Sequence, residues 1–310
     1  MTSPADAAPA PLLRVVGLSK QFPGVRALDE VDLDLTPGEV HALVGENGAG
    51  KSTLIKILSG LFQPSAGTIT LDGRPREFGG PVQSRGAGIS VIAQEFNLVP
   101  QLTVAENIFL GQEPRTRLGL VDKTTMDERS RALLATLGLG ASPRQRVEHL
   151  AVADQQLVEI AKALSQEFRV LVMDEPTAAL NAAEVDRLLA IVDGLRKEGR
   201  SVLYVSHRLG EIFRIADRVT VLRDGRRVTT VPIAATTEPA VVAWMLGRTV
   251  EEAEIVRAAP AADRPSAVTV GGLTIPGVLD DVSFELRYGE VLGVAGLVGS
   301  GRSELSRVMA

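Results

Sequence analysis

The chain has 310 residues, more than one average domain, and 45% of them are hydrophobic while 23% are charged, as in globular proteins with a sizeable core. Its formal net charge of −5 gives no support to nucleic acid as a partner, because nucleic acids select basic surfaces. The chain has no cysteine, which excludes disulfide frameworks, thiol catalysis and cysteine-based zinc sites.

The amino terminus, MTSPADAAPAP, has no basic segment followed by an apolar one. We therefore expect residues 1–11 to be a disordered lead and not a signal peptide. No stretch approaches the roughly 20 apolar residues of a membrane-spanning helix. The longest apolar run, VLGVAGLVGS from Val291, is short and interrupted by glycines. We expect membrane contact only through partner subunits.

Short strand-like runs alternate with helical patterns over residues 12–248, the first predicted domain. Residues 12–18 and 27–35 alternate apolar and polar side chains, which predicts half-buried antiparallel strands. Residues 39–44 form an apolar run that leads into a glycine-rich loop, and residues 51–61 have helical spacing. An antiparallel β lobe and the first strand and helix of an α/β core are therefore expected.

The rest of this domain continues the α/β pattern. Residues 102–164 are more helical and form a predicted insertion. Residues 170–173 and 201–205 are short, apolar and β-branched, as parallel strands buried on both faces are. Residues 181–197 place apolar side chains at helical spacing between those strands. Together the elements predict an α/β fold with an antiparallel β lobe and a helical insertion.

Residues 249–266 are rich in alanine, proline and charge, which predicts a linker. Beyond it, residues 267–310 repeat the order of the first domain. VLDDVSFEL and GEVLGVAGLVGSGRSEL follow the pattern of VRALDEVDLDL and GEVHALVGENGAGKSTL. The repeat has a period of roughly 250 residues, so we expect the start of a second domain of the same kind.

The segment GENGAGKST fits the pattern G-x-x-x-x-G-K-[ST] and lies between a predicted strand and a predicted helix. Its glycines let backbone N–H groups surround phosphate oxygens, and the helix start adds its dipole. Lys51 is expected to reach the β- and γ-phosphates as a catalytic cation, and Ser52 to ligate Mg²⁺. The predicted ATP-binding residues of this P-loop are Gly45, Glu46, Asn47, Gly48, Ala49, Gly50, Lys51, Ser52 and Thr53.

The segment VLVMDEP is an apolar strand that ends in two carboxylates. Alone, such a pair is equally well explained as a solvated turn. With the phosphate-binding loop upstream, we expect Asp174 to hold Mg²⁺ and nucleotide. Glu175 is then placed to polarise the attacking water as the general base.

Further motifs in the same order resemble the P-loop nucleotide-binding domain of ABC transporters. The resemblance implies that Phe22 stacks on adenine, although a partly buried core phenylalanine explains it equally well. It also implies that Gln94, in VIAQEF, ligates Mg²⁺ near the nucleotide and couples to membrane subunits. His207, in YVSHRL, would contact the γ-phosphate as a catalytic residue. A surface glutamine and a buried histidine are the alternatives.

Within that family, the chain most resembles the ATP-binding subunits of ribose-, xylose- and galactose-type importers, in which two such domains share one chain. The phrases KQFPGVRAL, LVGENGAGKSTL, NLVPQLTVAENIFLG, QQLVEIAKALS and MLGR support this, as does GLVGSGRSE, with Arg302 in place of the catalytic lysine. The resemblance implies an ATPase that energises import of a simple sugar at the cytoplasmic face of the bacterial cell membrane. ATP and Mg²⁺ would be its cofactors. Transmembrane permease subunits, a sugar-binding protein and a second nucleotide-binding domain would be its partners.

The family signature LSGGQ is altered in this chain, where residues 150–154 are LAVAD. In the family each ATP lies between the P-loop of one domain and the signature of the other. LAVAD would therefore face the loop that has Arg302, so both altered elements would fall in one composite site. We infer one hydrolytic site and one degenerate site that still binds nucleotide, because arginine keeps the positive charge. The altered signature positions are Ala151, Val152, Ala153 and Asp154.

Two other functions stay open. A soluble tandem ABC ATPase that acts on the ribosome or DNA is disfavoured by the short Ala/Pro-rich linker and the acidic chain. A non-hydrolysing nucleotide-binding regulator is compatible with LAVAD and a partial second domain, but the intact catalytic side chains argue against it. Asn181, where many relatives have Asp, is a further mild departure at the expected interface between domains. The transported solute could be ribose, xylose, galactose, another monosaccharide or a nucleoside.

Overall fold

The structure is a computed structural model that describes residues 10–94, 97–247, 264–296 and 300–309. The chain divides into two compact units, Met1–Val250 and Glu251–Ala310. Most of the predicted lead and most of the predicted linker lie outside the described residues. No helix of the described residues is both long enough and apolar enough to cross a membrane.

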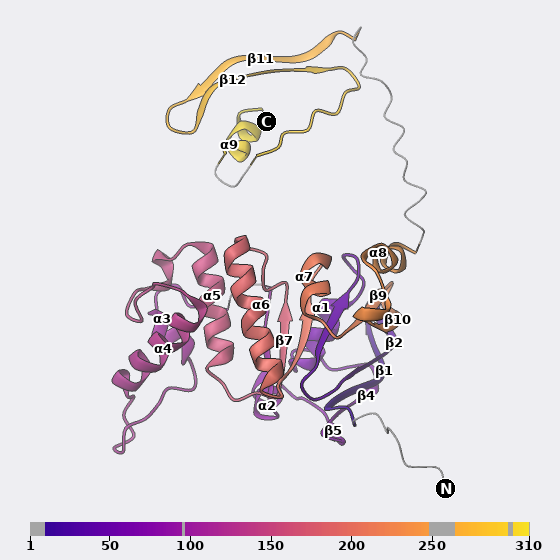
Figure 1. The fold of residues 1–310 in the computed structure, drawn as a ribbon, viewed down its shortest axis with the longest axis vertical. Helices are drawn as coiled ribbons and strands as arrows, with labels where there is room; N and C mark the ends of the chain where they lie inside the picture. The colour runs from indigo at the N-terminus through magenta and orange to yellow at the C-terminus, as the bar shows by residue number, and fades with distance from the viewer. Residues whose placement is uncertain (1–9, 95–96, 248–263, 297–299, 310) are drawn as a thin grey trace. The chain divides into compact units, whose positions relative to one another are not determined.

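A four-stranded antiparallel sheet forms the front of the first unit (Figure 1). Burial alternates over much of β1 and β2, with inward residues such as Leu13 and Val15 fully buried, because successive side chains of a strand point to opposite faces. This confirms the antiparallel lobe that the alternating sequence predicts. In sheet order its strands are β2 (Val25–Leu35), β1 (Leu13–Phe22), β4 (Ala66–Leu71) and β5 (Arg74–Arg76).

A six-stranded sheet forms the centre of the unit. Five strands are parallel, and the edge strand β10 pairs antiparallel with β9. The central strands β3, β7 and β8 are buried at every position, as parallel strands covered on both faces must be. In sheet order the strands are β10 (Arg226–Pro232), β9 (Arg218–Arg223), β3 (Val40–Val44), β8 (Ser201–Val205), β7 (Val170–Asp174) and β6 (Ile89–Ile92).

Helices cover both faces of the central sheet. On one face, α1 (Lys51–Leu58) and the antiparallel lobe pack against residues such as Leu43 and Leu203. On the other face, the apolar sides of four helices pack against residues such as Ala42 and Tyr204. These helices are α5 (Val152–Leu164), α6 (Ala182–Lys197), α7 (Leu209–Ile215) and α8 (Glu238–Leu246).

The helical insertion lies at one side of the sheet in Figure 1. A capping box between Thr103 and Glu106 starts α3 and fixes the entry to the insertion, since both side chains satisfy backbone N–H groups. Asn181 forms the same kind of box with Glu184 at the start of α6, so this departure from the family pattern has a local structural role. The remaining helices of the first unit are α2 (Pro81–Gly86), α3 (Val104–Ile108) and α4 (Lys123–Leu137), with 3-10 turns at Val147–His149 and Ile233–Ala235.

The second unit repeats the order of the first in part. The antiparallel pair β11 (Ser266–Ile275) and β12 (Leu279–Arg287) corresponds to β1 and β2, and α9 (Arg302–Met309) corresponds to α1. Residues 291–295, which correspond to β3, form no strand. In the first unit β3 is paired on both sides, with β8 and β9. The described part of the second unit offers no such neighbours, and a parallel strand forms only by pairing.

A buried polar network fastens the amino-terminal end of β3 to β9. Glu39 is 4% exposed, and its carboxylate accepts hydrogen bonds from Arg218 Nε at 2.7 Å and from Thr36 Oγ1 at 2.7 Å. His41 lies between Glu39 and Thr220, at 3.0 and 2.7 Å. Burial alone would raise the pKa of Glu39, but hydrogen bonds from His41 and Arg218 outweigh it and hold the pKa well below the ordinary value. The network therefore stabilises the ionised carboxylate.

We predict that Glu39→Gln lowers the free energy of unfolding at pH 7 by about 2 kcal/mol, because Arg218 loses its buried counter-charge. The folded-state pKa of Glu39 is depressed, so its contribution is present above the ordinary value of 4.5 and is lost as the pH falls towards the depressed one. The difference between the variant and the wild type should shrink below pH 4.5. Denaturant unfolding at pH 7 and pH 3.5 measures it.

The matched control is Asp34→Asn. Asp34 also contacts Arg218, at 2.8 Å, but its side chain is 44% exposed, so we expect a loss below about 1 kcal/mol. Equal losses for the two variants, or a Glu39→Gln effect that is the same at both pH values, would contradict the prediction.

Candidate functional site

One cavity of about 1020 Å³ lies where β3, β7 and β8 end. The loop after β3, the two carboxylates at the end of β7 and the histidine after β8 all open into it. The carboxyl ends of parallel strands meet at one edge of a sheet, which is where ligands bind in open α/β sheets. The predicted site residues that line the cavity are Gly45, Glu46, Asn47, Gly48, Ala49, Gly50, Lys51, Ser52, Thr53, Gln94, Asp174, Glu175 and His207.

The glycine loop between β3 and α1 depends on the absence of side chains at two positions. Gly50 has a φ of +100°, and a Cβ there would lie 2.6 Å from the carbonyl oxygen of Ala27. A Cβ at Gly45 would meet the carbonyl oxygen of Leu222. Gly50 is also the N-cap of α1, with no side-chain cap and no acidic residue in the first turn. The start of α1 can therefore donate backbone N–H groups to an anion.

Lys51 supplies the positive charge of the loop. Its Nζ donates to the carbonyl oxygens of Gly45 at 2.6 Å and Glu46 at 3.0 Å. Burial lowers the pKa of Lys51, while the carboxylates of Glu175 and Asp174 oppose this shift. The ammonium is therefore fixed over the loop and close to both carboxylates, as the predicted phosphate contact requires.

Asp174 and Glu175 differ in environment although they are adjacent. Asp174 is 7% exposed, and burial together with the charge of Glu175 raises its pKa to about 6 against the opposing effect of Lys51. Glu175 adopts a left-handed backbone with a φ of 49°, a strained state that costs a non-glycine residue about 1–3 kcal/mol. Its Oε2 lies 2.9 Å from Nδ1 of His207. The two predicted catalytic side chains are thus in contact.

The comparisons with known proteins agree with this geometry. Residues 28–178 match the family described as ABC transporter. Residues 28–178 therefore carry the ABC transporter domain that this family model describes. An ATP-binding cassette of an ABC transporter, solved in its ADP conformation, matches with a TM-score of 0.64 and 25% identity and covers 77% of this chain and 100% of its own. The P-loop fold with its antiparallel lobe and helical insertion is confirmed.

Two relatives are similar over nearly the whole chain. The ribose import ATP-binding protein RbsA 2 of Streptomyces avermitilis is 51% identical over 100% of this chain and 61% of its own length. A putative ribose/galactose/methyl galactoside import ATP-binding protein of Burkholderia ambifaria is 50% identical over 98% of this chain and 59% of its own. The chain thus spans about three fifths of the length of these curated relatives.

Glu211, which sequence reasoning missed, joins the segment that follows Glu175 to the helix that follows His207, the two residues of the predicted catalytic pair. Its Oε2 accepts hydrogen bonds from Thr177 Oγ1 at 2.9 Å and from the Tyr204 hydroxyl at 2.8 Å. All three residues are buried. Thr177 follows Glu175 by two residues, and Glu211 follows His207 by four. The bonded group therefore sets the position of the base relative to the histidine. An acidic residue among the apolar side chains of α7 was the available signal.

Nucleotide binding is a property of this domain family, and the predicted Mg²⁺ ligands fit such a complex. Ser52, Gln94 and Asp174 line the main cavity and also a neighbouring one of about 450 Å³. Within the described ranges, no group of three or more His, Asp or Glu side chains could hold a metal by itself. One carboxylate, one hydroxyl and one amide suit Mg²⁺, which takes its remaining ligands from phosphates and water.

Phe22 is the one predicted site residue that does not line the cavity. It lies at the end of β1, where its ring contacts Phe62 edge to face at 5.5 Å, with Lys20 Nζ 5.2 Å from its centroid. The cavity-lining residues that the predictions did not include are Val25, Arg26, Ala27, Ala178, Asp224, Gly225 and Met245.

The altered signature forms the start of α5. Ala151 is the N-cap residue and makes no side-chain cap hydrogen bond. Val152 is 58% exposed. None of the residues from 150 to 154 lines the main cavity, so within this unit the signature stands apart from the P-loop.

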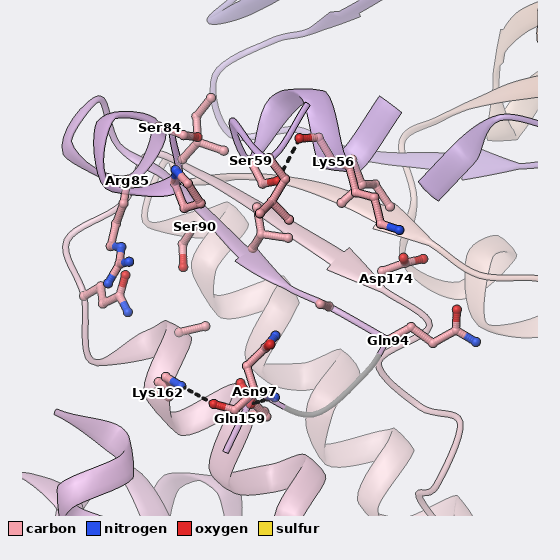
Figure 2. A pocket seen from close by; sticks show the side chains of 18 of the residues that line it. Lys56, Ser59, Ser84, Arg85, Ser90, Gln94, Asn97, Glu159, Lys162 and Asp174 are labelled. Atoms are coloured by element: carbon pink, nitrogen blue, oxygen red, sulfur yellow. Dashed lines mark hydrogen bonds between the residues drawn. The ribbon is translucent and has the colours of Figure 1, made fainter. Parts of the chain in front are cut away.

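The neighbouring cavity shows how Gln94 is connected to the signature helix. Figure 2 shows Glu159 and Lys162 of α5 gathered at Asn97. Glu159 Oε1 accepts from the Asn97 backbone N–H at 2.5 Å, and Lys162 Nζ donates to the Asn97 carbonyl at 2.8 Å. Burial raises the pKa of Glu159, although the charge of Lys162 and the Asn97 N–H oppose it. Both backbone polar groups of Asn97, three residues after Gln94, are therefore bonded to side chains of α5.

We predict that Asp174→Asn stabilises the chain in the absence of metal and nucleotide. The folded-state pKa of Asp174 is raised to about 6 from 3.8, so the group favours folding below pH 4 and loses that contribution as the pH rises through 6. The variant should be more stable than the wild type by about 1–2 kcal/mol at pH 7.5. At pH 4 the two should be alike. Thermal unfolding in EDTA measures the difference.

Asp186→Asn is the control, because the side chain of Asp186 is 62% exposed. A stabilisation by Asp174→Asn that is equal at both pH values would contradict the titration argument. A destabilisation at pH 7.5 would contradict the burial argument itself.

Proposed function

We propose that this chain is an ATP-binding and ATP-hydrolysing subunit that energises import of a simple sugar. The observation that supports it most is the single cavity in which Lys51, Asp174 and the Glu175–His207 pair meet. The names of the similar proteins, which refer to ribose or to ribose, galactose and methyl galactoside, favour a monosaccharide as the transported solute.

In the proposed reaction, the P-loop backbone and the Lys51 ammonium bind the triphosphate. Glu175 accepts a hydrogen bond from the attacking water and takes its proton, while His207 orients the carboxylate and donates to the γ-phosphate. Ser52, Gln94 and Asp174 would hold Mg²⁺, which neutralises phosphate charge when bound. The left-handed backbone at Glu175 directs the base into the cavity.

The proposed partners follow from the same assignment. Transmembrane permease subunits would receive the movement produced by ATP, and a sugar-binding protein would deliver the solute to them. The chain would then sit at the cytoplasmic face of the cell membrane, where ATP is available. We propose no nucleic-acid partner. The proposed domains are residues 12–248 and 267–310, joined by a linker at 249–266.

We further propose that the chain supplies one competent P-loop and one weak signature. The exposed start of α5, without a serine at Ala151, would face the P-loop of a second nucleotide-binding domain. Taken by itself, the second unit has Arg302, the first residue of α9, where the first unit has Lys51. Arginine keeps the charge but not the compact ammonium. That composite site would bind nucleotide without efficient hydrolysis.

We expect the 310-residue chain to bind Mg²⁺–ATP tightly and to hydrolyse it slowly, because two copies can offer each ATP only the LAVAD signature. Turnover should stay within about twofold of the Glu175→Gln variant, since without a clamped γ-phosphate the base contributes little. Calorimetry and phosphate release measure the two quantities. Absence of ATP binding would refute the proposed function. Brisk turnover that Glu175→Gln abolishes would show LAVAD to be an adequate clamp.

We predict that Ala151→Ser restores part of the clamp. At the N-cap of α5 a serine hydroxyl accepts from a free backbone N–H, which should stabilise the fold by about 1 kcal/mol. The same hydroxyl should raise ATP turnover of the chain several-fold. The double variant with Glu175→Gln separates the two effects, because it should keep the gain in stability and lose the gain in turnover. A gain in stability alone would contradict the signature assignment.

A further inference from the structure

Three separate segments that hold no predicted site residue also line the main cavity, and together they are called its second end. They are residues 25–27 of β2, the turn at Asp224 and Gly225 between β9 and β10, and Met245 near the end of α8. All of them lie outside residues 28–178, the part of the chain that matches the family. These lining residues therefore come from other parts of the sequence than the P-loop and the two carboxylates of the phosphate site.

This second end directly adjoins the P-loop. A Cβ on Gly50 would lie 2.6 Å from the carbonyl oxygen of Ala27 and 3.6 Å from Cα of Gly225. The backbone N–H of Asp29 donates to the carbonyl of Gly225 at 2.8 Å, which fixes the β9–β10 turn against β2. A nucleotide whose phosphates lie on the loop has the rest of this cavity for its ribose and base.

The end of α8 is fastened beside that turn, next to β9 and β10 in Figure 1. Arg223 NH1 donates to the carbonyl of Trp244 at 3.0 Å. Val241, on the inner side of α8, is fully buried. Gly247 ends the helix in the left-handed region, with a φ of 72°, and a Cβ there would lie 2.7 Å from Arg223 NH1. Met245 is thus held in the cavity wall by its neighbours on both sides.

The side chains at this end suit an aromatic ring. Met245 is half-buried, and its unbranched, polarisable thioether packs well against aromatic edges and faces. The side chain of Arg26 is 57% exposed and is held at one side by Asp29, at 2.6 Å, which leaves its guanidinium plane available for stacking. Phe22, by contrast, packs on Phe62 outside the cavity lining.

The geometry points to Met245 and Arg26 as the side chains that contact the aromatic base of a bound nucleoside di- or triphosphate. This inference rests on the nucleotide binding of the proposed function and adds the residues that recognise the base. Met245 extends the nucleotide site to α8, so the helix that closes the first unit is part of the ligand site.

The test compares the binding of Mg²⁺–ATP, Mg²⁺–ADP and inorganic tripolyphosphate to the full chain by calorimetry. Met245→Ala and Arg26→Ala should each weaken ATP and ADP by about fivefold, since each removes one contact to the base. Tripolyphosphate has no base, so its affinity should not change. Met245→Leu keeps the apolar contact and should stay within about twofold of the wild type.

Leu246→Ala is the matched control on α8. Leu246 follows Met245 directly, its side chain is 38% exposed, and it does not line the cavity. Phe22→Ala is the rival variant. Wild-type affinity for ATP in Met245→Ala, or an equal loss of ATP and tripolyphosphate, overturns the inference. So does a loss confined to Phe22→Ala. If the wild type itself binds no ATP, the proposed function fails with it.

Photolabelling of the wild-type chain with an azido-adenine ATP gives a measurement that needs no variant to fold. Trypsin cuts after Arg227 and Arg248, so Met245 is recovered in the peptide of residues 228–248. We expect label in that peptide, abolished by excess ATP. Label confined to Phe22 would overturn the inference.

Discussion

Parallel pairing of the central strands is the constraint on which the site depends. β3 pairs with β8 and β9, and β8 pairs with β7, so three loops distant in sequence leave the sheet at one edge. The strands are buried on both faces by α1 and the antiparallel lobe on one side and by α5 to α8 on the other. Because every strand position is packed, the loops cannot shift without disturbing the core.

The features of the site that oppose folding lie at that same edge of the sheet. Asp174 is a buried carboxylate beside another carboxylate, and Glu175 has a strained backbone. Neither feature helps the fold, and both are typical of functional sites. The opposite end of the sheet has the reverse character, since Glu39 is fully paired with Arg218 and His41. The stabilising network of Glu39 thus lies at the end of the sheet away from the cavity.

The sequence was sufficient for those parts of the site that are continuous along the chain. The loop from Gly45 to Thr53 and the Asp174–Glu175 pair follow from local patterns whose backbone requirements are strict. The contacts of Glu211 and the place of Met245 in the cavity wall were not predictable, because each depends on which distant strand or turn the helix packs against. For Phe22 the sequence left two explanations open. Its packing against Phe62 is a tertiary contact, which local sequence does not determine. Residues 291–295 show the same limit, since their apolar pattern forms a strand only when partners are present.

Helix α5 is the element through which the site and the rest of the unit are joined. Its first residues are the altered signature, and further along the helix Glu159 and Lys162 bond the backbone N–H and the backbone carbonyl of Asn97. Asn97 lies three residues after Gln94, which lines the cavity beside Ser52 and Asp174. The helix that begins with the altered signature is therefore in direct polar contact with the chain three residues beyond a residue of the cavity wall.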